Sequence, residues 1–253
     1  MPARPTPVTD ADLIEIFSSI QGEGPLIGYR QLFIRFARCN LACHYCDTPY
    51  KTVPLCQVET APGSETFAAW QNPVSRQQIE SLVKDWTGLL PGLHHSISLT
   101  GGEPLLQQQV LMDWLPKLRA YLPIYLETNG TLPEQLEALL PLIDYISMDI
   151  KLPSIAGQGA LWDQHRAFLQ LARQKQCFVK VVIDKQTPRE ELLEAASLVA
   201  ATAPEVDFIL QPYTGPQGID LSTQALLEMQ QTVATIHPRV RVIPQTHNFL
   251  GVL

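Results

Sequence analysis

Three cysteines, Cys39, Cys43 and Cys46, lie in one short segment with the spacing C-x3-C-x2-C. Thiolates at this spacing can converge on a single [4Fe-4S] cluster, which leaves one of its four irons without a protein ligand. A structural zinc site needs four ligands, usually two cysteine pairs, and the sequence has no second C-x2-C; the nearest further candidates are His44 and Cys56. The spacing therefore favours an iron-sulfur cluster whose open iron can bind a substrate or cofactor.

Composition restricts the class of protein and of partner. The chain has 253 residues, of which 45% are hydrophobic, enough for one large core. An odd count of five cysteines, three of them clustered, does not suit a disulfide scaffold, so we expect a reducing, cytoplasmic setting. Residues 1–10 have no apolar targeting core, and no apolar run is long enough for a membrane span. A net charge of -7 argues against nucleic acid and favours a small polar substrate.

Apolar β-rich runs alternate with helical patterns along the chain, which predicts parallel strands joined by helices. The expected strands cover 31–37, 96–100, 124–128, 145–150, 177–183, 207–212 and 240–244. The expected helices cover 76–86, 105–121, 133–140, 160–176, 188–201 and 222–236. We therefore predict an α/β fold, a single domain over 1–253, built as a partial (β/α)6-type barrel with its active site at the carboxyl ends of the strands.

The stretch 53–75 follows the cysteine loop and shows neither the helical nor the strand period clearly. It contains Pro54, Pro62, Gly63 and Pro73, which are turn-forming residues. We expect this stretch to be an irregular or mobile insertion.

Chemically suggestive turns follow four of the predicted strands. The cysteine loop follows the first, and Gly101, Gly102 and Glu103 follow the second. The two glycines would let the backbone approach a ligand closely, and Glu103 could accept a hydrogen bond from an ammonium group. A Gly-Gly turn alone is weak evidence, but at a strand end downstream of the cysteines it suggests a cofactor clamp.

Two further turns are open to two interpretations each. Residues 127–130 read Glu-Thr-Asn-Gly, which is either a loop entry or a polar lining of the site. Asp149 and Lys151 frame the end of the next strand, where the lysine either caps the sheet or joins the carboxylate in binding a zwitterionic cofactor.

These motifs together resemble the radical S-adenosylmethionine enzymes. The full set is similar to that of the 7-carboxy-7-deazaguanine synthase family over nearly the whole chain. The residues that carry this resemblance are 15–17, the Gln-Gly-Glu-Gly run within 19–24, Gly28, 33–35, the Cys-Asp-Thr of 46–48, 100–104, 127–130 and the tail 245–251. Two departures are the longer stretch 53–75, and Asp149-Ile150-Lys151 where some members have Ser-Pro-Lys.

The resemblance implies a radical ring contraction of 6-carboxy-5,6,7,8-tetrahydropterin to 7-carboxy-7-deazaguanine, with loss of ammonia. It implies a [4Fe-4S] cluster on Cys39, Cys43 and Cys46, and S-adenosylmethionine as a second cofactor. The residues implied for S-adenosylmethionine are His44, Tyr45, Asp47, Gly101, Gly102, Glu103, Asp149, Ile150, Lys151 and Gln211. Those implied for the pterin are Ile20, Gln21, Gly22, Arg35, Thr100, His247 and the terminal carboxylate of Leu253.

Mg2+ is the third implied cofactor, with the Thr48 hydroxyl as its protein ligand. For three of the residues a simpler role remains open. Thr48 could be an ordinary loop hydroxyl, Arg35 could form an internal salt bridge, and His247 could be a structural histidine.

The resemblance further implies a reductant partner such as flavodoxin or ferredoxin, a homodimer, and a product that enters queuosine biosynthesis. Two other classes of protein stay open at this point. An activase of a glycyl-radical enzyme would share the cysteine triplet and the Gly-Gly-Glu turn but lack the Gln-Gly-Glu-Gly run. A non-enzymatic iron-sulfur or zinc module would need no cofactor clamp.

Overall fold

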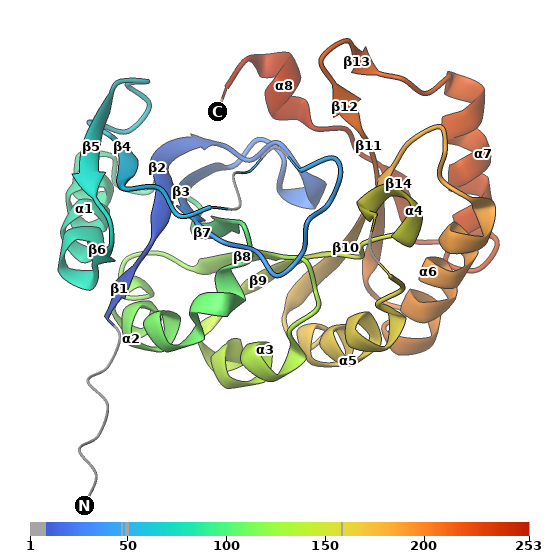
Figure 1. Ribbon diagram of the computed structural model, residues 1–253, viewed down its shortest axis with the longest axis horizontal. Helices are drawn as coiled ribbons and strands as arrows, with labels where there is room; N and C mark the ends of the chain where they lie inside the picture. Colours follow the sequence, from blue (N-terminus) through green and yellow to red (C-terminus); the bar gives the residue numbers. More distant parts are fainter. Residues whose placement is uncertain (1–8, 47, 49–50, 158, 253) are drawn as a thin grey trace, which may run out of the picture.

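The computed structural model describes residues 9–46, 48, 51–157 and 159–252. One curved sheet of ten strands forms its centre, in the order β14-β11-β10-β9-β8-β7-β3-β2-β4-β5. Figure 1 shows helices α2, α3, α5 and α6 along the outer side of this sheet. The α/β fold is therefore a sheet covered by helices on one side, as the alternating pattern predicts.

The strands of this sheet are β2 (Leu13–Ile20), β3 (Arg30–Phe36), β4 (Leu55–Glu59), β5 (Phe67–Gln71), β7 (Ser96–Gly101), β8 (Ile124–Thr128), β9 (Tyr145–Asp149), β10 (Gln176–Ile183), β11 (Asp207–Pro212) and β14 (Val240–Val242). The α-helices are α1 (Arg76–Leu89), α2 (Gln108–Leu118), α3 (Pro133–Leu139), α4 (Pro153–Ala156), α5 (Trp162–Ala172), α6 (Arg189–Thr202), α7 (Thr223–Ala234) and α8 (Thr246–Leu250). Short pairs join β1 (Asp10–Ala11) to β6 (Val74–Ser75) and β12 (Thr214–Gly215) to β13 (Gly218–Ile219).

The seven strands β3, β7, β8, β9, β10, β11 and β14 pair in parallel, each with the next. These are the seven strands expected from the sequence, and their parallel pairing is confirmed. β2 pairs antiparallel to β3 and was not among the expected strands. Its sequence mixes Glu15, Ser18 and Ser19 with apolar residues, so it lacks the apolar run that marks the expected strands.

The stretch 53–75 is regular, so the expectation of an irregular insertion is wrong. β4 and β5 form an antiparallel hairpin that extends the sheet beyond β2. Cys56 and Val58 alternate along β4 and are buried at 0% and 2% exposure. The turn-forming residues lie outside the two strands, at their ends and in the connection. They therefore mark the ends of the hairpin instead of an irregular segment.

The Glu59 carboxylate fastens this hairpin to the sheet. Its Oε2 accepts a hydrogen bond from the Ser18 amide at 2.9 Å, and its Oε1 accepts one from the Glu65 amide at 2.9 Å. Glu59 is only 2% exposed, so both bonds satisfy a carboxylate that burial would otherwise destabilise.

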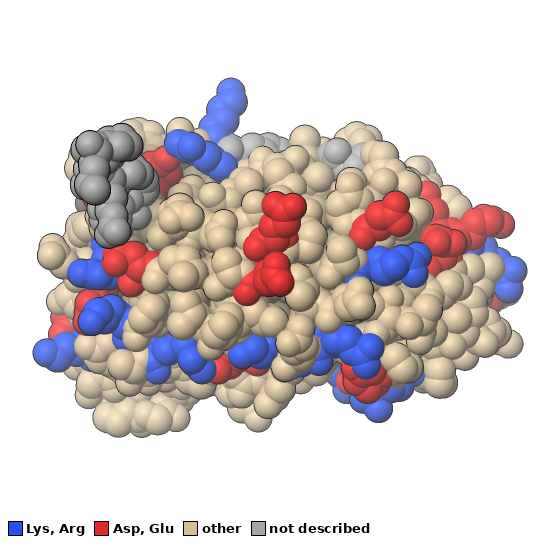
Figure 2. Space-filling model, turned by 90° about the horizontal axis from the view of Figure 1, so that it is seen from below, with Lys and Arg blue, Asp and Glu red and all other residues tan. Residues whose placement is uncertain are grey.

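Charged side chains are mixed on the face shown in Figure 2, where lysines and arginines alternate with acidic residues. No large field of one sign covers this face. No helix in the described part of the chain is long and apolar enough to cross a bilayer.

Trp114 on α2 is the largest fully buried side chain of the core. Its ring lies 6.1 Å from the ring of Phe36 on β3, and its Nε1 donates to the Thr9 carbonyl at 2.8 Å. It thus joins α2 both to the sheet and to the strand-like N-terminal segment.

We expect Trp114→Ala to lower the free energy of unfolding by about 3–5 kcal/mol, because it removes a buried ring and leaves a cavity. Guanidinium denaturation of the protein without its cluster measures this loss. Met112→Ala on the same helix is the matched control, since Met112 is 43% exposed, and it should change stability by less than about 0.5 kcal/mol. Equal effects of the two substitutions would contradict the assignment of Trp114 to the core.

Candidate active site

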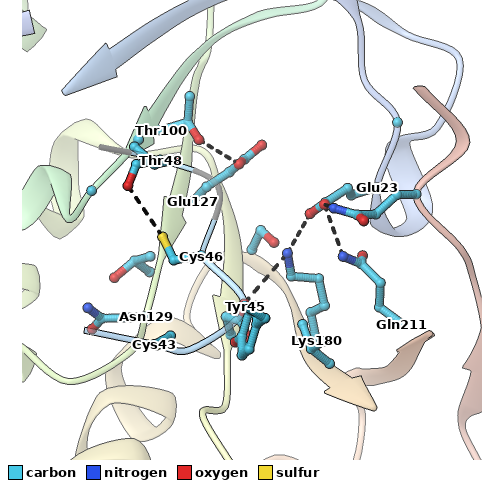
Figure 3. Close-up of a pocket in the computed structure, with 18 of the residues that line it drawn as sticks. Glu23, Cys43, Tyr45, Cys46, Thr48, Thr100, Glu127, Asn129, Lys180 and Gln211 are labelled. Atoms are coloured by element: carbon cyan, nitrogen blue, oxygen red, sulfur yellow. Dashed lines mark hydrogen bonds and ion pairs between the residues drawn. The ribbon is translucent and has the colours of Figure 1, made fainter. Parts of the chain in front are cut away.

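A cavity of about 350 Å³ opens at the carboxyl ends of the parallel strands. Residues of β2, β3, β7, β8, β9, β10 and β11 line it, together with the cysteine loop and the C-terminal segment. Figure 3 shows side chains from these distant parts of the sequence turned toward a common space. The predicted place of the site, at the strand ends, is where the cavity lies.

The cysteine loop forms one wall of the cavity, and Cys39, Cys43 and Cys46 all line it, none of them in a disulfide among the described residues. The Cys39 sulfur accepts hydrogen bonds from the Leu41 amide at 3.4 Å and from Asn129 Nδ2 at 3.7 Å. Such N–H donors stabilise a thiolate sulfur bound to iron. Asn129 therefore belongs to the surroundings of the cysteines, although it lies far away in the sequence.

The three cysteines lie on one wall of the cavity at the C-x3-C-x2-C spacing of an iron-sulfur cluster. Among the described residues, no three His, Cys, Asp or Glu side chains gather where a single metal ion would sit. Burial raises the pKa of the Cys39 and Cys43 thiols, so both are protonated at neutral pH until iron displaces the proton. The thiols and the donors around Cys39 fit an iron-sulfur cluster bound at the cavity wall.

The Gly-Gly turn after β7 lies directly against the segment that precedes the cysteines. A Cβ atom at Gly102 would overlap the Arg38 carbonyl. Gly101 has a backbone φ of +111°, which residues other than glycine rarely adopt. The Gly102 amide donates to the Phe36 carbonyl at 3.0 Å. Both glycines line the cavity, and the close approach of a ligand to their backbone stays a prediction.

Glu103 lies beneath the cavity wall and does not line the cavity. It is fully buried, and its carboxylate accepts hydrogen bonds from the Leu105 amide at 3.1 Å, the Thr128 hydroxyl at 3.0 Å and the Asn129 amide at 2.8 Å. Burial raises its pKa to about 7 despite these donors. The side chain thus supports the end of β8.

Asp149 and Lys151 form a buried ion pair at the end of β9, with 2.7 Å between Lys151 Nζ and Asp149 Oδ2. Lys151 also donates to the Tyr45 hydroxyl at 2.9 Å, which joins β9 to the cysteine loop. Burial alone would lower the pKa of Lys151, but the Asp149 carboxylate, Tyr45 and Cys43 together outweigh it, so the pKa lies well above its usual value. Asp149 Oδ1 is buried and has no hydrogen-bond partner among the described residues.

Polar residues from β2, β3, β7 and β8 form the opposite wall. Arg35 Nε contacts Glu15 Oε1 at 2.6 Å, so the internal salt bridge considered for Arg35 is present. Arg35 nevertheless lines the cavity. The Glu127 carboxylate accepts from the Thr100 hydroxyl at 2.8 Å and from Gln21 Nε2 at 2.9 Å, and it also lines the cavity.

Glu23 joins three distant parts of the chain. Its Oε2 contacts the Lys180 ammonium, and its Oε1 accepts from Gln211 Nε2 at 3.0 Å and from Gln245 Nε2 at 2.9 Å. Burial alone would raise the pKa of Glu23, but Lys180 and the amide donors lower it to about 2. Gln211 Oε1, on the far side of this amide, is buried and has no partner in the described part of the chain.

The C-terminal segment closes one side of the cavity. The Thr246 amide donates to the Gly22 carbonyl at 2.8 Å, and His247 lines the cavity. A Cβ atom at Gly22 would overlap His247, so the glycine allows the segment to lie directly on the end of β2.

Most of the expected site residues meet in this cavity. Those that line it are Gln21, Gly22, Arg35, Cys39, Cys43, Tyr45, Cys46, Thr48, Thr100, Gly101, Gly102, Asp149, Lys151, Gln211 and His247. Ile20, His44, Glu103 and Ile150 do not line it, and the His44 ring packs against Gly157 after α4. Asp47 and Leu253 lie outside the described residues.

Among the charged residues that line the cavity, Glu23 and Lys180 were assigned no role from the sequence, and Glu127 lay in the turn whose polar lining role was left open. Glu23 and Glu127 occur in motifs quoted for the family resemblance, so their motifs were noticed but their contacts were not. For Lys180 the available signal was a lysine within the apolar run of β10, where an unpaired charge would be costly.

Comparisons with known proteins agree with this geometry. The family model described as the Radical SAM superfamily matches residues 33–198. A 7-carboxy-7-deazaguanine synthase of Geobacter sulfurreducens is 46% identical over 96% of this chain and 98% of its own length, and one of Archaeoglobus fulgidus is 36% identical over 96% and 99%. The crystal structure of QueE from Escherichia coli has the same fold, with a TM-score of 0.57 at 18% identity over 94% of both chains.

The resemblance read from the motifs is thus confirmed. The radical SAM match covers more than half of the chain, and the relatives match over nearly its full length. The chain belongs to the 7-carboxy-7-deazaguanine synthase family of the radical SAM superfamily.

Proposed function

We propose that this chain converts 6-carboxy-5,6,7,8-tetrahydropterin to 7-carboxy-7-deazaguanine with release of ammonia, as a radical S-adenosylmethionine lyase. The observation that carries the proposal is one cavity that joins the three cysteines of the loop to Arg35, Thr100 and Glu127. A non-enzymatic iron-sulfur module would not need the polar residues that face the cysteines across the cavity. Family membership favours the lyase over a glycyl-radical activase.

The cofactor half of the site consists of the cysteine loop and the ends of β9 and β11. Cys39, Cys43 and Cys46 would hold a [4Fe-4S] cluster, which together with S-adenosylmethionine supplies the adenosyl radical that removes hydrogen from C6 of the pterin. The unpartnered oxygens Asp149 Oδ1 and Gln211 Oε1 are buried acceptors that hydroxyl or amino donors of S-adenosylmethionine would satisfy. Glu103 would act from beneath, by fixing the turn.

The substrate half consists of β2, β3, β7 and β8. No hydrogen bond from the terminal nitrogens of Arg35 occurs within the described residues, while Glu15 orients the guanidinium through Nε. The free edge of the fork would bind the pterin carboxylate bidentately. The Glu127 carboxylate accepts hydrogen bonds from the neutral donors Gln21 and Thr100, and it would accept further N–H groups from the aminopyrimidine edge.

Mg2+ would bind between the Thr48 hydroxyl and the substrate carboxylate. Thr48 is 8% exposed and lines the same cavity as Arg35 and Cys46. A hydroxyl, a carboxylate and waters are the oxygen ligands that Mg2+ prefers. His247 and the other residues of the tail 245–251 would cover the bound pterin.

Several finer points of the proposal concern partners and setting. The cluster needs an external electron, for which flavodoxin or ferredoxin is the proposed donor class. A homodimer, a cytoplasmic setting and delivery of the product to queuosine biosynthesis belong to the same proposal and follow from the family resemblance.

The whole proposal is tested by one assay. Reconstituted protein is incubated anaerobically with the pterin, S-adenosylmethionine, Mg2+ and a reductant, and the product is identified by its mass. Formation of 7-carboxy-7-deazaguanine together with ammonia supports the proposal. Cleavage of S-adenosylmethionine without any change in the pterin would refute it.

We expect replacement of Cys39, Cys43 or Cys46 by Ala, each alone, to abolish the visible absorbance of the reconstituted cluster, because each supplies one of three ligands. Iron analysis and absorbance measure this directly, without turnover. Cys56→Ala and Cys177→Ala are the controls, since burial raises the pKa of both thiols to about 12 and neither lines the cavity. Loss of the cluster in Cys56→Ala would show that the ligand set is wrong.

We expect Arg35→Lys to weaken pterin binding by about 10- to 100-fold, because the ammonium keeps the charge but not the planar fork. Calorimetry with the cluster-loaded protein gives the Kd. Arg239→Lys is the control, since it alters an ion pair with Asp207 on the surface, and it should leave the Kd unchanged. An unaltered pterin affinity in Arg35→Lys would remove Arg35 from the substrate site.

We expect Thr48→Val to blunt the rise of activity with added Mg2+, because it removes the oxygen while keeping the shape of the side chain. Thr48→Ser keeps the oxygen and should retain more of the response. The measurement is initial rate against Mg2+ concentration, with cluster content and S-adenosylmethionine affinity as controls that should not change. A Mg2+ response in Thr48→Val equal to that of the parent would eliminate the proposed metal ligand.

A further inference from the structure

Lys180 is a buried cation placed between the two halves of the site. On β10, Val179 and Val181 are fully buried on the helix-covered face, so Phe178, Lys180 and Val182 face the interior. The Lys180 side chain is 12% exposed and lines the cavity. Figure 3 shows its ammonium group between Glu23 and the Tyr45 side of the cavity.

The ammonium group contacts two carboxylates. It forms a short ion pair with Glu23 Oε2 and lies 3.6 Å from Asp149 Oδ2. Both carboxylates raise the pKa of Lys180 against the effect of its burial, so the amine is charged at every physiological pH. One charge is therefore shared between two acidic groups.

The two carboxylates lead to different parts of the molecule. Glu23 accepts from Gln245, and the adjacent Gly22 accepts from Thr246, so this end holds the C-terminal segment. Asp149 pairs with Lys151, which donates to Tyr45 in the cysteine loop, so the other end holds the cofactor half.

At the Asp149 end, one carboxylate oxygen is available to a further donor. Asp149 Oδ1 is buried without a partner among the described residues, while Oδ2 is shared by Lys151 and Lys180. A donor group that binds Oδ1 would lower the negative potential at this carboxylate and so weaken its attraction for Lys180. Lys180 would then pair more strongly with Glu23 Oε2 and so hold the carboxylate in the orientation in which Oε1 accepts from Gln245 of the tail.

We propose that Lys180 is a positioning residue that couples the cofactor half of the cavity to the C-terminal segment over the substrate half. This inference rests on the proposed function, because it takes S-adenosylmethionine as the ligand at Asp149 and the pterin as the ligand beneath the tail. Binding of each ligand then favours binding of the other, and the coupling is reciprocal. Gln211, an uncharged residue, provides a second connection to Glu23. Its Nε2 donates to Glu23, and its Oε1, which has no partner among the described residues, can accept from a ligand.

A binding cycle on anaerobic, cluster-loaded protein tests the coupling. The Kd of S-adenosylmethionine is measured by calorimetry with and without saturating pterin, and we expect the pterin to tighten it by about fivefold or more in the parent. Lys180→Met should reduce this ratio to below about twofold, whereas Lys180→Arg, which keeps the cation, should retain most of it. Lys185→Met is the matched control, because it removes an exposed ion pair with Asp220, and its ratio should equal that of the parent.

Hydrogen exchange gives a second measurement that needs no pterin. S-adenosylmethionine alone should slow amide exchange in 246–252 of the parent, and should not do so in Lys180→Met. If Lys180→Met does not fold, the measurement on the parent alone tests the inference. Amide exchange in 246–252 of the parent that is unchanged on adding S-adenosylmethionine would overturn it.

The outcomes separate this inference from the proposed function. The coupling role alone would be overturned if the parent binds both ligands but the Kd of S-adenosylmethionine is the same with and without pterin. It would also be overturned if pterin lowers this Kd equally in Lys180→Met and in the parent. A parent that binds neither ligand would overturn the proposed function and the coupling together.

Discussion

Parallel pairing of the strands from β3 to β11 is the constraint on which the site depends. In this register Arg35 lies beside Thr100, and Lys180 lies beside Asp149 on the next strand. Parallel strands bring their carboxyl ends to one edge, so polar residues at successive strand ends meet without any long loop. The helices on the outer side bury the other face and hold this register, because a slip by one residue would turn the polar set into the core.

Charge compensation explains how so many polar groups can lie in that interior. The described charged residues that line the cavity comprise three acids, Glu23, Glu127 and Asp149, and three bases, Arg35, Lys151 and Lys180. Burial of any one of these charges without a partner would cost several kcal/mol, roughly. The contacts of the acids are asymmetric, since the hydrogen bonds to Glu127 within the described residues come from neutral donors while Glu23 and Asp149 share Lys180. A ligand that donates N–H groups to Glu127 would further stabilise the negative charge of this carboxylate.

The sequence predicted those features that depend on local spacing. The cysteine triplet and the strand-helix alternation are readable because ligand spacing and hydrophobic period are properties of neighbouring residues. The contacts of Lys180 were not readable, since Glu23 lies 157 residues away along the chain and only the folded sheet brings them together. The hairpin of β4 and β5 was misread because its prolines and glycine outweighed the short alternation of Cys56 and Val58. The motif assigned Glu103 to S-adenosylmethionine, but its contacts with Thr128 and Asn129 at the end of β8 are long-range and could not be read from the sequence.

The same long-range contacts determine how the cavity can close. The tail is held by Gln245 on Glu23 and by Thr246 on the Gly22 carbonyl, while Phe249 and Leu250 stay 68% and 57% exposed. A segment with exposed apolar residues gains little from packing, so its position depends mainly on these polar contacts. Because Glu23 is also the partner of Lys180, the closing segment is fastened to the charge network of the site and not to the hydrophobic core. Closure over a substrate can therefore respond to the electrostatic state of the cofactor half, which a tail anchored in the core could not do.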